Sequence, residues 1–265
     1  MKTSEDLKNI VKETYGEIAT QKPSCGCGCS CSGDVQDFSI FVENYNNLPG
    51  YVKEADLGLG CGLPTEYAGI KEGDSVLDLG SGAGNDCFVA SAIVGEKGHI
   101  TGLDFTKEMI DKANVNKRWR GIENIGFVLG DIESMPFEDN QYNVIISNCV
   151  LNLVPDKKKA FDEIFRVLKP GGHFCVSDIV LKGELPENVR EAEAMYASCV
   201  SGALQKEEYL EIITKAGFID IGEKKMVRND MPDELLLQYI SKDVVAAYRK
   251  SGAGIFSITV TGFKK

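Results

Sequence analysis

Two hydrophobic patterns alternate along most of the chain. Runs of consecutive apolar residues, such as Val144-Ile145-Ile146, are followed by segments with an apolar residue every three or four positions. The first pattern is typical of strands covered on both faces, and the second of amphipathic helices. The predicted strands are residues 75–79, 99–104, 125–129, 143–147, 173–178, 218–223 and 254–261. The predicted helices are residues 4–20, 85–94, 106–120, 156–168, 187–200, 206–216 and 233–250.

Alternating strands and helices predict an α/β fold with a doubly wound, mostly parallel sheet and helices on both faces. We expect three regions. Residues 1–64 form an N-terminal extension with a helix, a Cys-rich loop and a segment that covers a cleft, and residues 65–225 form the main domain. Residues 226–265 supply a C-terminal helix and an edge strand that complete the sheet.

Composition removes several classes of function. The 265 residues carry 29 Lys and Arg against 40 Asp and Glu, and a net charge of −11 argues against nucleic-acid binding. The sequence contains no run of about 18 apolar residues, the length that a membrane span needs, and its polar N-terminus is not typical of a signal peptide. We therefore expect a cytoplasmic protein with reduced thiols. Nine cysteines stand beside only two histidines, so thiol chemistry is favoured over histidine chemistry.

A glycine-rich turn follows the first predicted strand. In Val76-Leu77-Asp78-Leu79-Gly80-Ser81-Gly82-Ala83-Gly84-Asn85 the spacing is G-x-G-x-G, and Asn85 replaces the last glycine of a dinucleotide motif. This favours a ligand without a pyrophosphate, although a plain turn between a strand and a helix would also fit. The segment resembles the first motif of class I S-adenosylmethionine (SAM) methyltransferases.

Two acidic residues follow the next two strands. Asp104 can accept hydrogen bonds from ribose hydroxyls, and Asp131 from an adenine amine while Ile132 packs on the ring. The resemblance implies a seven-stranded mixed, Rossmann-like sheet whose last strand is antiparallel at one edge. It also implies that SAM is the cofactor. The implied cofactor contacts are Asp78, Gly80, Ser81, Gly82, Gly84, Asp104, Asp131, Ile132 and Asn148.

The cysteines fall into different physical classes. Cys175 lies in an apolar strand and is expected to be a buried, inert thiol. Cys87 begins a helix, where it is either a reactive thiol of lowered pKa or a packing residue. Cys149 ends the fourth strand, where parallel sheets place their ligand crevice, although an isolated cysteine can also be structural.

Three local strings carry a narrower resemblance. They are GLGCGLP around Cys61, SNCVLNLVPDK around Cys149 and SCVSGAL around Cys199, with GAGNDCF in support. Together they resemble the arsenite SAM methyltransferases. That resemblance implies that Cys61, Cys149 and Cys199 bind trivalent arsenic as thiolates, for arsenic methylation and detoxification. The substrate would be arsenite or its thiol conjugates, with glutathione or thioredoxin as reductant.

The residue types agree with this chemistry but leave alternatives. Soft thiolates select thiophilic centres, and an arsenic lone pair carries no proton, so no general base is required. Asn148 and Cys149 stand where a base for an organic acceptor would be expected. A methyltransferase for a small organic acceptor, and a non-enzymatic thiol metal binder on the same scaffold, remain open.

Four further thiols form the sequence CGCGCSC. Cys25, Cys27, Cys29 and Cys31 are redox candidates, because the family uses an N-terminal cysteine as redox partner of the cysteine near the first strand. The spacing does not match a zinc finger. The cluster could also bind thiophilic metal, or take no part in catalysis.

Overall fold

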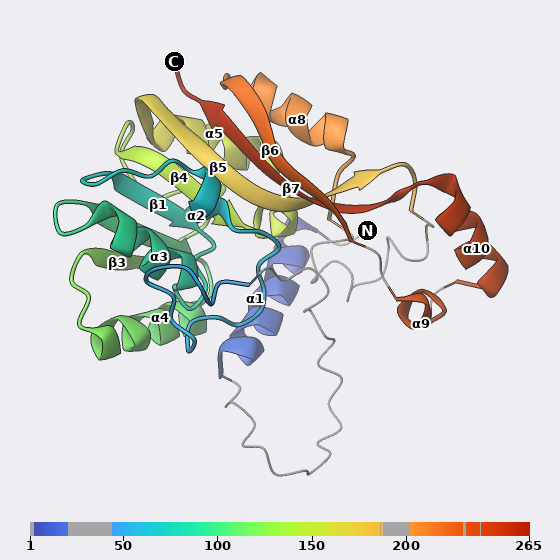
Figure 1. Ribbon diagram of the computed structural model, residues 1–265, viewed down its shortest axis with the longest axis horizontal. Coiled ribbons are helices and arrows are strands. Elements are labelled where there is room, and N and C mark those ends of the chain that lie inside the picture. Colours follow the sequence, from blue (N-terminus) through green and yellow to red (C-terminus); the bar gives the residue numbers. More distant parts are fainter. Residues whose placement is uncertain (1–2, 21–43, 186, 188–201, 230–231, 239) are drawn as a thin grey trace, which may run out of the picture.

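The fold is a seven-stranded mixed sheet with the order β3-β2-β1-β4-β5-β7-β6 (Figure 1). The computed structural model describes residues 3–20, 44–185, 187, 202–229, 232–238 and 240–265. The first five strands are parallel, and β7 pairs antiparallel with both β5 and β6. The strands are β1 (Ser75–Leu79), β2 (His99–Asp104), β3 (Ile125–Leu129), β4 (Tyr142–Asn148), β5 (Leu168–Lys182), β6 (Ile219–Asn229) and β7 (Gly254–Phe263).

The last strand corrects one expectation. β7 is antiparallel as predicted, but it lies between β5 and β6 and is not an edge strand. Burial explains the order, because Ile255, Ile258 and Val260 on β7 are buried while β6 is half-exposed or exposed throughout. A strand of charged residues such as Glu223 and Lys224 suits a sheet edge better than an apolar strand does.

The helices follow the predicted pattern with one further correction. Residues 233–250 form two helices, and Ser241 occupies the N-cap of the second with an extended backbone. The predicted helix at residues 187–200 lies outside the described residues, apart from residue 187. The described helices are α1 (Ser4–Thr20), α2 (Pro64–Tyr67), α3 (Asn85–Val94), α4 (Lys107–Arg120), α5 (Lys157–Val167), α8 (Lys206–Lys215), α9 (Asp233–Leu236) and α10 (Lys242–Ser251), with the 3-10 helix η2 (Leu151–Leu153).

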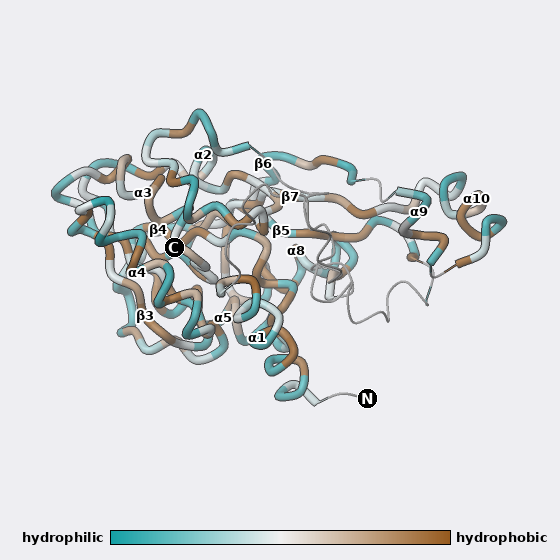
Figure 2. The backbone as a smooth tube through the Cα atoms, turned by 90° about the horizontal axis from the view of Figure 1, so that it is seen from below, coloured by the Kyte–Doolittle hydropathy of each residue, from teal (hydrophilic) through white to brown (hydrophobic). Residues whose placement is uncertain are grey.

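Successive strand residues face two separate cores. Leu77 and Ile145 pack with apolar residues of α5 and α8, whereas Val76, Val144 and Phe88 of α3 pack in the other core. Figure 2 shows the hydrophobic stretches along β5 and β7. Within the part of the chain that the structure describes, no helix is long and apolar enough to cross a membrane.

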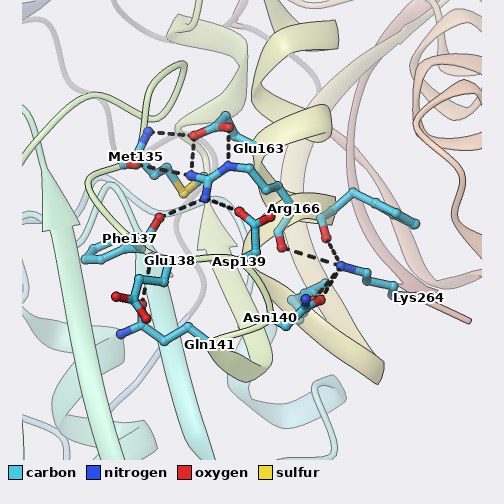
Figure 3. A network of polar contacts seen from close by, with 11 residues as sticks. Met135, Phe137, Glu138, Asp139, Asn140, Gln141, Glu163, Arg166 and Lys264 are labelled. Carbon is cyan, nitrogen blue, oxygen red and sulfur yellow. Dashed lines mark hydrogen bonds and ion pairs between the residues drawn. The ribbon is translucent and has the colours of Figure 1, made fainter.

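A polar network fastens the start of β4 to the end of the chain (Figure 3). Arg166 donates two hydrogen bonds to the carboxylate of Glu163, at 2.7 and 2.8 Å, and a third to Asp139 at 2.8 Å. Lys264 donates to the carbonyl oxygens of Phe165 and Leu168, both at 2.7 Å. These contacts hold β7 against the turn between α5 and β5, at the end of the sheet opposite the strand ends that carry the glycine turn.

Candidate active site

A cleft opens where the carboxyl ends of β1, β2 and β4 meet, and together with the solvent at its mouth it encloses about 760 Å³. The glycine turn forms one wall, and Gly80, Gly82 and Gly84 all have positive φ angles, of 68°, 51° and 98°. A Cβ atom on Gly80 would lie 2.4 Å from a methyl carbon of Val150. The turn therefore requires glycine there for its backbone angle and for its close approach to the residue after Cys149.

Asp104 is fixed in place by backbone donors at the end of β2. Its two oxygens accept hydrogen bonds from the backbone amides of Gly82, at 2.9 Å, and Thr106, at 2.8 Å. Burial raises the pKa of this carboxyl group, and the hydrogen bonds from Thr106 and Gly82 oppose that rise. The Asp104 carboxylate accepts one hydrogen bond from the glycine turn and one from the segment after β2, so it keeps lone pairs for a ligand in the cleft.

Asp131 and Ile132 line an adjoining cleft of about 380 Å³ that shares Gly80 and Asp104 with the first. Lys8 of α1 donates a hydrogen bond of 2.6 Å to Asp131 and pairs with Glu133 as well. The structure therefore places both predicted adenine contacts beside the glycine turn, with a helix that begins at residue 4 covering them.

Two of the predicted thiols meet beside the cleft. The sulfurs of Cys61 and Cys149 lie within 4.8 Å of each other, and both residues are buried, at 1% and 7% exposure. Cys149 lines the cleft and has a left-handed backbone, with a φ angle of 59°, held by a hydrogen bond from its amide to Ser177 O at 2.8 Å. A non-glycine residue in this conformation is uncommon and marks a position that its surroundings impose.

Asn148 joins the two cysteine segments. Its Oδ1 accepts from the amide of Cys61 at 3.0 Å, and its Nδ2 donates to the carbonyl oxygen of Gly62 at 2.8 Å. Nδ2 also lies 3.2 Å from Asp86 and 2.5 Å from the hydroxyl of Tyr45. The side chain therefore positions Cys61 as well as lining the cleft.

Tyr45 and Asp86 were not predicted from the sequence as site residues, yet both line the cleft. Burial raises the pKa of Asp86 to about 6, against the hydrogen bonds from Asn148 and Tyr45 that favour its charged form. The Tyr45 hydroxyl donates to the Asp86 carboxylate at 3.0 Å. The acidic residue in Gly84-Asn85-Asp86 was a readable signal, but nothing in the sequence placed Tyr45.

Asp178 was also missed as a site residue. One of its carboxylate oxygens lies within 4.8 Å of both sulfurs, and the residue is 1% exposed. It accepts hydrogen bonds from the amide of Ile179 at 2.9 Å and from the hydroxyl of Tyr209 at 3.3 Å. Burial raises its pKa to about 7. A carboxylate inside an apolar strand was the sequence signal.

The other described cysteines behave as packing residues. Cys87 donates to the buried Asp78 at 3.2 Å, and burial raises the pKa of its thiol well above the ordinary value, which argues against a reactive thiolate. Burial raises the pKa of Cys175 to about 12, which confirms an inert thiol in the core. Cys199 and the cluster Cys25, Cys27, Cys29 and Cys31 lie outside the described residues.

Comparison with known proteins identifies the family. A methyltransferase domain model matches residues 70–217. An arsenic(III) S-adenosylmethionine methyltransferase from Chlamydomonas reinhardtii superposes with a TM-score of 0.67 at 35% identity, over 77% of this chain and 67% of that one. The chain belongs to the arsenite methyltransferase family.

Relatives in this family come from distant organisms. The arsenite methyltransferases of Halobacterium salinarum and Homo sapiens are each 40% identical, over 81% and 80% of this chain. The chain spans 58% of the length of each of these two curated family members.

The cleft fits the SAM that this fold takes as cofactor. Three buried polar atoms of the cleft have no hydrogen-bond partner within the described residues, namely Ser81 Oγ, Asn85 Oδ1 and Thr106 Oγ1. Buried polar atoms are rarely left unpaired, so their presence beside Asp104 indicates a polar ligand. A nucleoside with an amino-acid tail supplies the hydroxyl and amine donors that these oxygens can accept.

Proposed function

We propose that this chain transfers methyl groups from SAM to trivalent arsenic held by cysteine thiolates, as part of arsenic detoxification in the cytoplasm. The single observation that carries the proposal is the pair of buried sulfurs of Cys61 and Cys149, which lie within 4.8 Å of each other, with Cys149 lining the cofactor cleft. Thiolates are the ligands that a soft, thiophilic centre selects. Cys199 is proposed as the third ligand.

The residues of the cleft divide the work. Asp104, the glycine turn, and Asp131 with Ile132 would hold the nucleoside, and Asn148 positions the Cys61 loop. When bound, SAM supplies an electrophilic methyl group on a positively charged sulfonium. Asp78, Asp86 and Asp104 line this part of the cleft, where burial raises the pKa of each carboxyl group. The positive charge of a bound sulfonium would favour their ionised forms and be stabilised by them.

The arrangement needs no general base for the transfer itself. Arsenic bound by three sulfurs has a lone pair and no proton to remove, so the enzyme's task is positioning. His99 begins β2, and His173 pairs with Val144, four positions before the end of β4 that leads into Cys149. Neither lines the cleft.

The test is a methylation assay with arsenite, SAM and excess thiol. We expect methylated arsenic from the wild type and a loss of at least ~100-fold in rate for Cys61→Ser and Cys149→Ser, because a misplaced arsenic loses the benefit of positioning. Cys175→Ala is the matched control, because this buried thiol lies in the sheet and not at the cleft, and should stay near wild-type activity.

The outcomes separate the alternatives. A wild type that binds S-adenosylhomocysteine but methylates no arsenic would refute the proposal in favour of an organic acceptor. Arsenite binding by a wild type that neither binds S-adenosylhomocysteine nor methylates arsenic would favour a thiol metal binder. We propose that a thiol reductant such as glutathione or thioredoxin acts through Cys25, Cys27, Cys29 or Cys31; serines at all four should slow turnover when thiol is limiting.

A further inference from the structure

The carboxylate beside the two thiols has no part in the arsenic chemistry described above. A soft As(III) centre is satisfied by sulfur ligands, whereas Asp178 presents a hard oxygen donor. Its carboxylate oxygen and the sulfurs of Cys61 and Cys149 all lie within 4.8 Å of one another, and all three residues are buried. Mixed sulfur and oxygen donors are characteristic of a borderline cation such as Zn²⁺.

We infer that Cys61, Cys149 and Asp178 form a binding site for a divalent thiophilic cation of the zinc type, which competes with arsenic for the two thiols. The cation site stands on its own geometry, and only the competition rests on the proposed function.

The surroundings of Asp178 orient it for this task. The amide of Ile179 donates to Oδ1 and the hydroxyl of Tyr209 to Oδ2. The backbone amide of Asn152 also donates to this carboxylate. A carboxylate offers about four acceptor sites, so about one remains for a cation. Outer hydrogen bonds of this kind fix the orientation of metal ligands. Tyr209 is fully buried on α8, so the group that donates to Oδ2 is itself held in place by packing.

The spacing of the three donors is compatible with a loaded site. A tetrahedral Zn²⁺ with bonds of about 2.0–2.3 Å keeps its donors about 3.5 Å apart. The described donors all lie within 4.8 Å of one another, so no pair needs to approach by more than about 1.3 Å, which is within the reach of staggered side-chain rotations. Three protein donors leave a fourth tetrahedral position for water or another ligand.

The test uses Cd²⁺ as the probe, because the thiolate-to-cadmium charge-transfer absorption reports sulfur ligation directly. The background is the full chain with Cys25, Cys27, Cys29 and Cys31 replaced by serine, which removes the competing cluster. We expect one tightly bound equivalent, its loss in Cys61→Ser and Cys149→Ser, and at least ~10-fold weaker binding in Asp178→Asn. The matched carboxylate control, Asp131→Asn, should bind Cd²⁺ like the background protein.

Arsenite binding provides the opposite contrast. Asp178→Asn should weaken Cd²⁺ binding and spare arsenite, whereas Cys199→Ser should weaken arsenite and spare Cd²⁺. Zn²⁺ should displace Cd²⁺ and raise the apparent KM for arsenite without changing the maximal rate. If Cd²⁺ binds as inferred but arsenite does not bind at all, the proposed function fails and the cation site stands.

Two results would overturn the inference. One is Cd²⁺ binding in Asp178→Asn at the affinity of the background protein. The other is a cadmium site with sulfur donors alone, which would exclude the carboxylate. X-ray absorption at the cadmium edge of the loaded Cys199→Ser protein, in which Asp178 is unchanged, measures this and should show both sulfur and oxygen donors. The second measurement decides the matter even if Asp178→Asn does not fold.

Discussion

Single atoms decide how closely the Cys61 segment approaches the sheet. Gly62 carries its loop against β5, and a Cβ atom there would lie 2.5 Å from Ser177 Oγ and 2.6 Å from Ser177 Cβ. Ser177 cannot easily yield, because its hydroxyl is hydrogen-bonded to Thr259 at 2.9 Å in the core of the sheet. The segment therefore depends on glycine for contact distance and not for its backbone angle.

We predict that Gly62→Ala lowers the free energy of unfolding by about 1–3 kcal/mol, the usual cost of forcing extra atoms into a packed site. It should also weaken arsenite binding, because Cys61 moves with the loop. Urea denaturation and a binding titration measure the two effects. The control is Gly126→Ala on β3, where the nearest atom would be 3.7 Å away; it should change stability by less than about 0.5 kcal/mol. Equal stability of both variants would contradict the prediction.

At the same scale, the sequence identified residues whose type alone is informative. The glycines of the turn, Asp104 and Cys149 could be assigned because turn chemistry and strand ends constrain them. The role of Tyr45 and the contacts of Asp178 could not be assigned, because they arise across 41 and 31 residues, to Asp86 and Tyr209. Such contacts depend on how distant segments meet, which one sequence does not specify.

Among the elements, α1 has the most direct influence on the cofactor cleft. Val11 and Tyr15 line the larger cleft, and Lys8 pairs with Asp131 and Glu133 at the smaller one. Helical periodicity predicted this helix correctly, but not its position over the cleft. The position depends on burying Val11, which is 1% exposed, against the sheet.

We predict that Lys8→Met weakens binding of S-adenosylhomocysteine about 5-fold. Lys8 fixes the Asp131 carboxylate and offsets its repulsion by Glu133, and a partly exposed pair of this kind contributes about 1 kcal/mol. Isothermal titration calorimetry measures the change. Lys12→Met, on the exposed face of the same helix, is the control and should bind like the wild type. Unchanged affinity in Lys8→Met would show that α1 does not position the adenine contacts.

The order of the strands shows where element-level prediction ends. All seven predicted strands are present, because consecutive apolar runs report burial. The prediction that β7 lies at the edge was wrong, because the edge position belongs to the strand whose side chains are polar enough to face solvent. That strand is the charged β6. The prediction of a single helix at residues 233–250 was wrong, because the helical spacing of apolar residues continues through the segment that separates α9 from α10.

Across the whole molecule, acidic groups are buried around one cleft. Burial raises the pKa of Asp78, Asp86 and Asp104, and these three side chains line the same space. A buried carboxyl group whose pKa is higher in the folded chain than in the unfolded chain binds its proton more tightly when folded. Stability is then greatest below the unfolded pKa, near 3.9, falls as the pH rises to the folded pKa, and is constant above it.

Asp86 makes this dependence measurable. Its pKa of about 6 predicts that the folded chain loses about 1.5 kcal/mol of stability between pH 4.5 and pH 6 on account of this group. Asp86→Asn should remove that part of the slope in urea denaturation. Tyr45→Phe should have the opposite effect, because the Tyr45 hydroxyl favours the charged carboxylate of Asp86. Without this hydroxyl the pKa of Asp86 rises further, and the pH range over which stability falls extends above pH 6. If Asp86→Asn keeps the full slope, the dependence belongs to the other buried carboxyl groups. If Tyr45→Phe leaves the window in place, the Tyr45 hydroxyl does not lower the pKa of Asp86, and the hydrogen bond from Asn148 is left as the contact that opposes burial.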